Sequence, residues 1–301
     1  MRLPRLKHGS KVDVVLNGIQ HQPGGRVGAR LSLLEPLPFQ WDRIEAVLAY
    51  QSHYTYEKSV DRNAVVRALN VVSIFDLNAG SPRPRTESVW VETAAATVWE
   101  SGPTSTNGAH TVELDLPLDA PATCKDLVSW SLVVRAVGPE PSREIATAPF
   151  RVVSHRPPPG WLPAGPTGDT YGPLTAELEF DQDCVAAGDV LRGRARITTQ
   201  GETKPISVKV RVSECLQFHP TDRLPGEPSS TLVVKADLAE HHELEPGVAH
   251  EWCFELAIPV EACPTVRSRH ADLSYLVRLE ANSTLMKYTN TIREIAVTSP
   301  P

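Results

Sequence analysis

Three arginines alternate with apolar or small residues at positions 191–197, which have the sequence Leu-Arg-Gly-Arg-Ala-Arg-Ile. Successive side chains of a β-strand point to opposite faces, so Arg192, Arg194 and Arg196 share one face of such a strand. Guanidinium groups bind carboxylates and phosphates through paired hydrogen bonds, which makes this row a candidate site for an acidic or phosphorylated segment of a partner. The alternative is a solvated face on which the arginines pair with Glu or Asp of neighbouring strands.

Histidines and carboxylates cluster at two places in the sequence. Residues 240–243 have the sequence Glu-His-His-Glu, and His270 lies two positions before Asp272. A divalent metal ion needs several converging ligands, and these spacings match no standard metal motif. We therefore predict solvated loops at these positions, with no metal ion and no other cofactor.

Motifs typical of enzymes are missing from the sequence. There is no nucleophile elbow, no glycine-rich phosphate loop and no His-Glu-x-x-His motif. Serine, histidine and aspartate recur throughout, but nothing in their spacing orders them into a triad. The sequence therefore predicts a protein that is not an enzyme and has no catalytic residues.

The composition is that of a globular protein. Of the 301 residues, 41% are hydrophobic and 22% are charged, and the length suggests two domains that each bury a core. The net charge of −6 provides no overall positive field for nucleic acid or an anionic membrane. No stretch approaches the roughly 18 consecutive apolar residues of a membrane span, and no signal-peptide run follows the first ten residues. We expect a cytoplasmic protein without an integral membrane segment and without a nucleic-acid partner.

The cysteines favour a reducing environment. Their number is odd, they form no Cys-x-x-Cys pair, and most lie in apolar stretches, which predicts reduced and buried thiols. They are Cys124, Cys184, Cys215, Cys253 and Cys263.

Apolar and polar residues alternate with a period of two in several segments. The clearest is 174–181, and the pattern recurs at 112–116, 206–213 and 275–280. These segments are bounded by Gly, Pro and Asn clusters, and no long amphipathic helical pattern separates them. The sequence therefore predicts an all-β protein with antiparallel sheets packed as sandwiches. Residues 61–69 fit either a short helix or a strand followed by a loop.

Residues 154–173 contain six prolines and four glycines, a composition unsuited to a strand ladder or a helix. We predict a linker there, between an N-terminal domain at 1–153 and a C-terminal domain at 174–301. Trp161 is costly to leave in water, so we expect it to anchor the linker against one of the two domains. The proline run in 156–159 also suits a polyproline II ligand, although a stiff spacer explains it without a partner.

An internal repeat relates the two sides of this linker. Residues 116–123 and 132–135 resemble 258–265 and 275–278, at offsets of 142 and 143. A period near this length is far too long for a solenoid or a propeller blade. It predicts a duplicated domain.

Each half begins with a strand, a glycine-containing turn and a second strand, and later carries a strand that ends in a proline-marked loop. The two turns are at 23–27 and 186–190, at an offset of 163. This duplicated order resembles the arrestin clan, in particular its bacterial sporulation-control proteins and arrestin-domain adaptors. The resemblance implies two tandem immunoglobulin-like β-sandwiches and a scaffold function, and none of the clan's phosphate-sensing polar-core residues has a match here. The resembling stretches are 12–33, 109–153, 174–212 and 251–297.

The sequence thus predicts an arrestin-like, non-enzymatic scaffold or adaptor in signalling, stress or sporulation-like control. We expect a protein partner. If the arginine row binds it, the partner is acidic; alternatively, a segment of the partner adds a strand to an exposed sheet edge. The oligomeric state stays open. The rival interpretation is a carbohydrate-binding or cell-surface module, which requires an exposed aromatic platform, whereas core packing is the alternative for most of the aromatic residues. The candidates for that platform are Trp41, Trp90, Trp99, Trp130 and Trp252.

Overall fold

The fold consists of strands joined by turns and loops. A computed structural model describes residues 12–58, 83–101, 108–163, 165, 167–170, 173–221, 228–283 and 287–301. These residues form eighteen strands and no helix, so the predicted all-β class is confirmed. In this part of the chain no helix has the length and apolar character needed to cross a bilayer. The ambiguous segment 61–69 lies outside the described residues.

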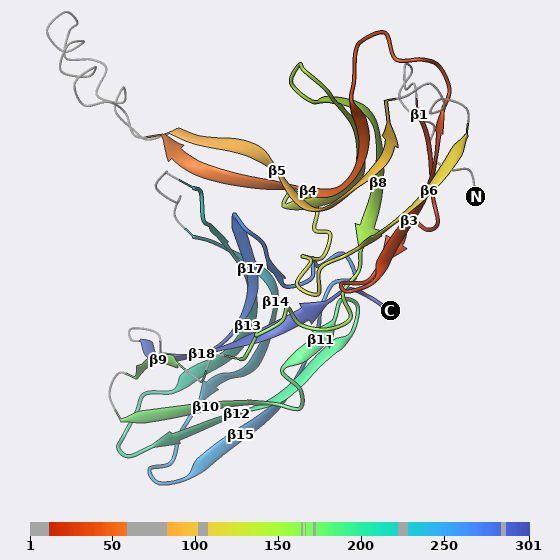
Figure 1. Cartoon of the computed structure of the whole chain (residues 1–301). Helices are drawn as coiled ribbons and strands as arrows, with labels where there is room; N and C mark the ends of the chain where they lie inside the picture. Colours follow the sequence, from red (N-terminus) through yellow and green to blue (C-terminus); the bar gives the residue numbers. More distant parts are fainter. Residues whose placement is uncertain are drawn as a thin grey trace, which may run out of the picture.

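The first half of the chain forms two sheets at one end of the molecule (Figure 1). Its strands are β1 (Val12–Leu16), β2 (Gln20–His21), β3 (Arg26–Leu33), β4 (Arg43–Lys58), β5 (Arg83–Glu100), β6 (Ala109–Asp115), β7 (Val128–Val137) and β8 (Arg143–Val152). One sheet has three strands in the order β1-β3-β6. The other has five strands in the order β2-β8-β7-β4-β5.

The second half forms two further sheets, and no ladder between described residues joins them to the first two. Its strands are β9 (Thr167–Thr170), β10 (Leu174–Phe180), β11 (Cys184–Ala186), β12 (Val190–Thr199), β13 (Ile206–Phe218), β14 (Ser229–His242), β15 (Ala249–Ala257), β16 (Val266–Arg267), β17 (Ala271–Asn282) and β18 (Lys287–Thr298). A three-stranded sheet has the order β10-β12-β15. The larger sheet has the order β11-β18-β17-β13-β14, with β9 paired to β18 and β16 paired to β17.

The strand order of the first half recurs in the second. β1-β3-β6 corresponds to β10-β12-β15, and β2-β8-β7-β4-β5 corresponds to β11-β18-β17-β13-β14. Even the two parallel pairs correspond, because β2 pairs with β8 and β11 pairs with β18 in parallel. The repeat predicted from short sequence stretches therefore extends to the connectivity of both sheets.

Individual hydrogen bonds repeat as well. The Thr123 amide donates to the Val152 carbonyl, and Thr123 Oγ1 accepts from the Val152 amide, both over 2.8 Å. Thr265 makes the same two bonds with Val297, over 2.7 and 2.8 Å. Since Thr123 and Thr265 are separated by the predicted offset of 142, this part of the sequence repeat marks equivalent positions.

The offset at the first turn differs by one residue from the prediction. The Leu116 amide donates to the Gly25 carbonyl over 2.8 Å, and the equivalent bond joins the Ile258 amide to the Asp189 carbonyl over 2.9 Å. Gly25 therefore corresponds to Asp189, at an offset of 164 rather than 163. The residues before Gly25 and Asp189 are Gly24 and Gly188, and both have a positive φ. Both turns therefore require a glycine at this position, which is the physical reason for the corrected alignment.

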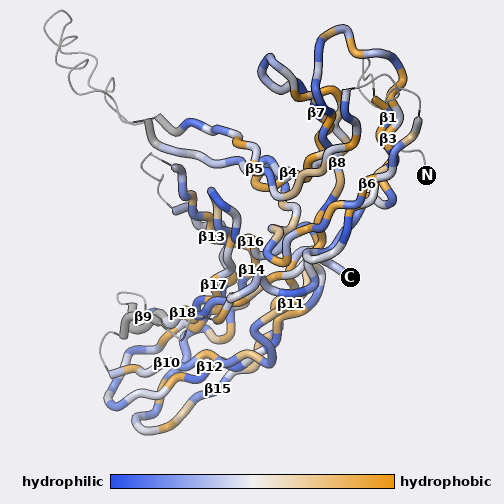
Figure 2. The backbone as a smooth tube through the Cα atoms, viewed as in Figure 1, coloured by the Kyte–Doolittle hydropathy of each residue, from blue (hydrophilic) through white to orange (hydrophobic). Residues whose placement is uncertain are grey.

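Alternate burial along the strands follows the predicted period of two. On β13, Ile206, Val208, Val210 and Val212 are each 0% exposed. Figure 2 shows the same alternation of hydrophobic and hydrophilic residues along β10, β12 and β15. An exception is Glu280 on β17, which is buried although it is charged, and which forms ion pairs with arginines of the same sheet.

The predicted linker contains one short strand, contrary to its composition. Thr167–Thr170, β9, pairs with Thr289–Ile292 of β18. The prolines of the linker lie outside these four residues, so every backbone N–H of the segment is available to a ladder. The expectation that 154–173 forms no ladder was therefore wrong for this segment.

Close packing at Gly193 provides a test of the fold. A Cβ at this position of β12 would lie 2.3 Å from the Glu179 carbonyl oxygen and 2.7 Å from the Phe254 ring. Because the backbone oxygen cannot move aside without breaking the ladder, we expect Gly193→Ala to lower the free energy of unfolding by about 1–3 kcal/mol or more. Gly201→Ala is the control, since its Cβ would make only an ordinary contact with Pro173 at 3.6 Å. Urea denaturation measures both, and equal midpoints would contradict the packing.

Candidate functional site

The arginine row lies on one face of β12, as the alternation predicted. The three side chains are 54–58% exposed, and each lies within ion-pair distance of a glutamate on β10 or β15. The pairs are Arg192–Glu255 at 2.8 Å, Arg194–Glu251 at 3.8 Å and Arg196–Glu177 at 3.7 Å. These neighbours balance the positive charge of the row, so its geometry is that of a solvated face rather than of an open anion site.

Trp161 lies against the larger sheet of the second half. Its side chain is half-buried, and its Nε1–H donates to Glu294 Oε1 on β18 over 3.2 Å. Its neighbour Leu162 is 79% exposed. The linker is therefore held at Trp161 and open to solvent one residue later.

The cluster at 240–243 is mostly exposed, as predicted, but residues 240–242 belong to strand β14 rather than to a loop, whereas His270 of the second cluster is buried. His242 belongs to β14, and its Nε2 lies 3.0 Å from Nδ1 of His250 on β15. His270 is 4% exposed and packs on the Tyr54 ring with centroids 4.9 Å apart. Asp272 instead contacts His219, at 3.0 Å. No group of three or more possible metal ligands converges in the described ranges.

The tryptophans form no exposed platform in the described part of the chain. Trp99 and Trp130 are buried, and the Trp130 Nε1–H donates to the Pro121 carbonyl over 2.8 Å. Trp252 is half-buried and stacks on the His250 ring. Trp41 is also half-buried, which leaves Trp90, 43% exposed, as the one exposed member of the five candidates. The surface that the carbohydrate interpretation requires is therefore not formed by these residues.

A cavity of about 650 Å³ lies where the two halves and the linker meet. The first half contributes residues 22–23 and 118–122, the linker region contributes 153–159, and the second half contributes 265–267. Residues 118–122 and Thr265 belong to the proline-marked loops that correspond in the repeat, and Val266–Arg267, which follows the second loop, is β16. We call this cavity the junction cleft.

Direct contacts hold the two halves together beside the junction cleft. The Arg269 amide donates to the Tyr50 hydroxyl over 3.4 Å, and burial raises the pKa of this tyrosine. At the other side, the Ser154 amide donates to Ser299 Oγ over 3.0 Å, and the Ser299 amide donates to the Ser154 carbonyl over 2.8 Å. The junction therefore combines buried aromatic contacts with backbone hydrogen bonds.

The charges of the junction cleft are unbalanced. Arg156 and Arg267 line it, both are exposed, and neither forms an ion pair with another described residue. Asp119 is the acidic residue in the lining, and His155 adds a group that becomes positive on protonation. The cleft therefore presents unpaired guanidinium groups to solvent.

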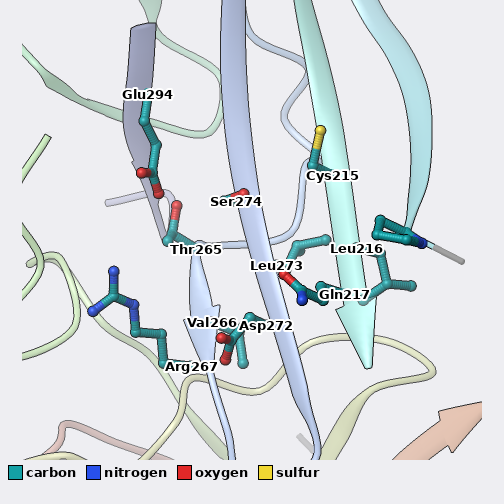
Figure 3. Close-up of a pocket in the computed structure, with 11 residues that line it drawn as sticks. Cys215, Leu216, Gln217, Thr265, Val266, Arg267, Asp272, Leu273, Ser274 and Glu294 are labelled. Carbon is teal, nitrogen blue, oxygen red and sulfur yellow. The ribbon is translucent and has the colours of Figure 1, made fainter. Parts of the chain in front are cut away.

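Of two smaller hollows, one has its positive charges in ion pairs and the other shares Arg267 with the junction cleft. In one of about 280 Å³, Lys209 pairs with Asp237 at 3.1 Å and Arg211 pairs with Glu280 at 3.4 Å. The other, of about 220 Å³, shares Arg267 with the junction cleft and is drawn in Figure 3. There β16 carries Arg267 toward the side of β18, while β13 carries Cys215 on the opposite side of β17.

Sequence reasoning did not predict Arg156 and Arg267 as a pair. In the sequence, Arg156 directly precedes a proline run, and Arg267 follows a proline-marked loop more than a hundred residues later. No local pattern connects them, because Arg156 lies in the linker and Arg267 lies beyond the repeated stretch 258–265.

Comparisons with known proteins add nothing to this geometry. No model of a protein family matches the chain, and a search of curated protein sequences finds no significant match. The function proposed below therefore rests on the contacts and charges of the chain itself.

The linker contact at Trp161 generates a graded prediction. Trp161→Ala removes a half-buried ring and its hydrogen bond to Glu294, and we expect the free energy of unfolding to fall by about 1–2 kcal/mol. Trp161→Phe keeps most of the ring packing and loses only the N–H, so about half of that effect is expected. Leu162→Ala is the control, because this side chain is exposed. Urea denaturation that ranks the three variants in any other order would contradict the anchoring contact.

Proposed function

We propose that this chain is a non-enzymatic, cytoplasmic scaffold or adaptor that binds an acidic segment of a partner protein in the junction cleft. The single observation that carries the proposal is the presence of Arg156 and Arg267 on the cleft without ion-pair partners among the described residues. An unpaired guanidinium on a concave surface is ready to form bidentate hydrogen bonds with carboxylates.

We further propose that the two halves are tandem immunoglobulin-like sandwiches in an arrestin-like arrangement, at 1–153 and 174–301. The repeated strand order and the repeated Thr123 and Thr265 hydrogen bonds support a duplicated domain. In such an arrangement the cleft between the domains combines loops from both, which suits recognition of an extended segment.

The walls of the cleft suggest the chemistry of the segment. Leu118 is 79% exposed, Val266 is buried, and the prolines of 157–159 add apolar surface. A segment with carboxylates for the two arginines and an apolar side chain for this wall satisfies both features. Because the whole chain carries a net charge of −6, the attraction is local to the cleft and short in range.

The arginine row of β12 is the weaker candidate for the same role. A ligand there would have to displace Glu255, Glu251 and Glu177 from their arginines before it gained contacts of its own. The junction cleft requires no such displacement.

Binding of an acidic probe tests the proposal. The probe is a fluorescein-labelled synthetic peptide with the repeat Glu-Glu-Leu, followed by fluorescence anisotropy. We expect the double variant Arg156→Ser/Arg267→Ser to bind at least tenfold more weakly than the unsubstituted chain, because two charge-assisted contacts are lost. We also expect affinity to fall as salt concentration rises.

A matched variant controls for net charge. Arg192→Ser/Arg194→Ser removes two arginines from the row on β12, and it should bind within twofold of the unsubstituted chain. Equal weakening by both double variants would show nonspecific attraction and reject the cleft. Absence of binding by the unsubstituted chain would reject the acidic-segment proposal as well.

A further inference from the structure

Three basic residues lie side by side on neighbouring strands of the larger sheet in the second half. The ladders place Arg211 of β13 opposite Lys235 of β14 on one side and opposite Arg278 of β17 on the other. The three side chains are 40–53% exposed. Like charges that face each other across strands destabilise a sheet. Such exceptions to favourable pairing are expected at functional sites.

The neighbouring carboxylates do not balance these charges. Four cations on this face, which we call the basic cluster, are Lys209, Arg211, Lys235 and Arg278. Asp237 lies 3.1 and 3.8 Å from the two lysines, and Glu280 lies 3.4 and 4.0 Å from the two arginines. Four positive and two negative charges leave an excess of two. On β12, in contrast, each arginine has a glutamate of its own.

The basic cluster borders a cavity of about 280 Å³. Lys209 and Arg211 line this cavity together with His241, and Ser207 and Asn282 add polar side chains to its wall. None of the described residues in the lining is acidic. Cationic groups and neutral hydrogen-bond donors therefore converge on one space, which is the surrounding that an oxyanion needs.

A β-bulge contributes His241 to the lining. Between Ile206 and Val208 the register of β13 with β14 shifts, so that Glu240 and His241 together oppose Ser207. His241 has a φ of 49°, a left-handed conformation that is uncommon for a residue with a side chain. Bulges next to binding sites re-aim side chains. This bulge places an imidazole in the wall of a cavity that two other strands supply with cations and an amide.

An anion can enter without displacing the carboxylates. The Glu280 side chain is only 10% exposed and lies between two arginines, so it stays where it is. Arg211 keeps an unused donor, because its Nε has no acceptor among the described residues. The hydrogen bond from Lys209 lowers the pKa of Asp237, and the charges of Lys235 and Arg211 act in the same direction. The local field is therefore positive even with both carboxylates in place.

We propose that this cavity binds the phosphate group of a small soluble molecule, either a phosphate ester or a pyrophosphate. A phosphate group carries about −1.5 to −2 charges at neutral pH and three acceptor oxygens. This charge matches the excess of two on the basic cluster, and the oxygens match donors that come from β13, β14 and β17. A single carboxylate supplies half of that charge and only two oxygens.

The site is separate from the junction cleft. The described linings of the two cavities have no residue in common, and the ligand classes differ, since the cleft is proposed to bind an acidic segment of a protein. The phosphate proposal therefore goes beyond the proposed function. Failure of one leaves the other standing.

Isothermal titration calorimetry of the full chain with inorganic pyrophosphate, in a buffer without magnesium, tests the proposal. We expect one site per chain, and succinate should bind at least tenfold more weakly. Lys209→Met should weaken pyrophosphate binding at least tenfold, and Asp237 keeps Lys235 as a partner in this variant. His241→Gly should weaken it about threefold, because glycine accepts the positive φ of this position without strain while the imidazole is lost.

Matched variants separate the site from general charge effects. Arg192→Ser also removes one positive charge, and Arg156→Ser/Arg267→Ser alters the junction cleft, so both should bind pyrophosphate within twofold of the unsubstituted chain. Pyrophosphate should also raise the thermal unfolding midpoint of the unsubstituted chain and of Arg192→Ser, but not that of Lys209→Met. This second measurement includes a check that each variant is folded.

Four results would overturn the proposal. They are no heat of binding and no rise in midpoint with the unsubstituted chain, equal affinity for succinate, equal weakening by Lys209→Met and Arg192→Ser, and a lipid as the ligand. For the last, the chain is sedimented with vesicles of phosphatidylcholine and phosphatidylglycerol. Sedimentation that Lys209→Met abolishes would assign the cavity to a lipid headgroup instead of a soluble molecule.

Discussion

Alternate side chains of β13 and β17 are completely removed from water, including Val208 and Val210 on one strand and Val277 and Leu279 on the other. The buried core contains residues from all four sheets, so each sheet turns one apolar row inward. Burial of these rows dominates the free energy of folding in a chain of this composition. The polar rows are therefore confined to outer faces, where their charges meet neighbouring strands.

This constraint decides which charged residues are available to a partner. On β12 the neighbouring strands carry glutamates in register with the arginines, and the charges cancel. Residues in loops have no register partners on a neighbouring strand. At the junction cleft, Arg156 comes from the linker, outside any ladder between described residues, and Arg267 comes from β16. The ladder with β17 places Asp272 opposite Arg267, but Asp272 contacts His219 at 3.0 Å. The junction cleft thus presents charge that its neighbours leave unbalanced, unlike the arginine row of β12.

Local patterns in the sequence determined the strands and the repeat, because alternation and turn chemistry act between near neighbours along the chain. The strands around 174–181 and 206–213, the solvent-facing side of the arginine row and the 142-residue offset at Thr123 all depend on such patterns. Tertiary structure alone decided the burial of Glu280, the pairing of β9, and the neighbours of Arg156 and Arg267. Those outcomes depend on which segments, far apart in sequence, share a sheet or a junction. The periodicity of one strand does not specify which distant segment lies beside it.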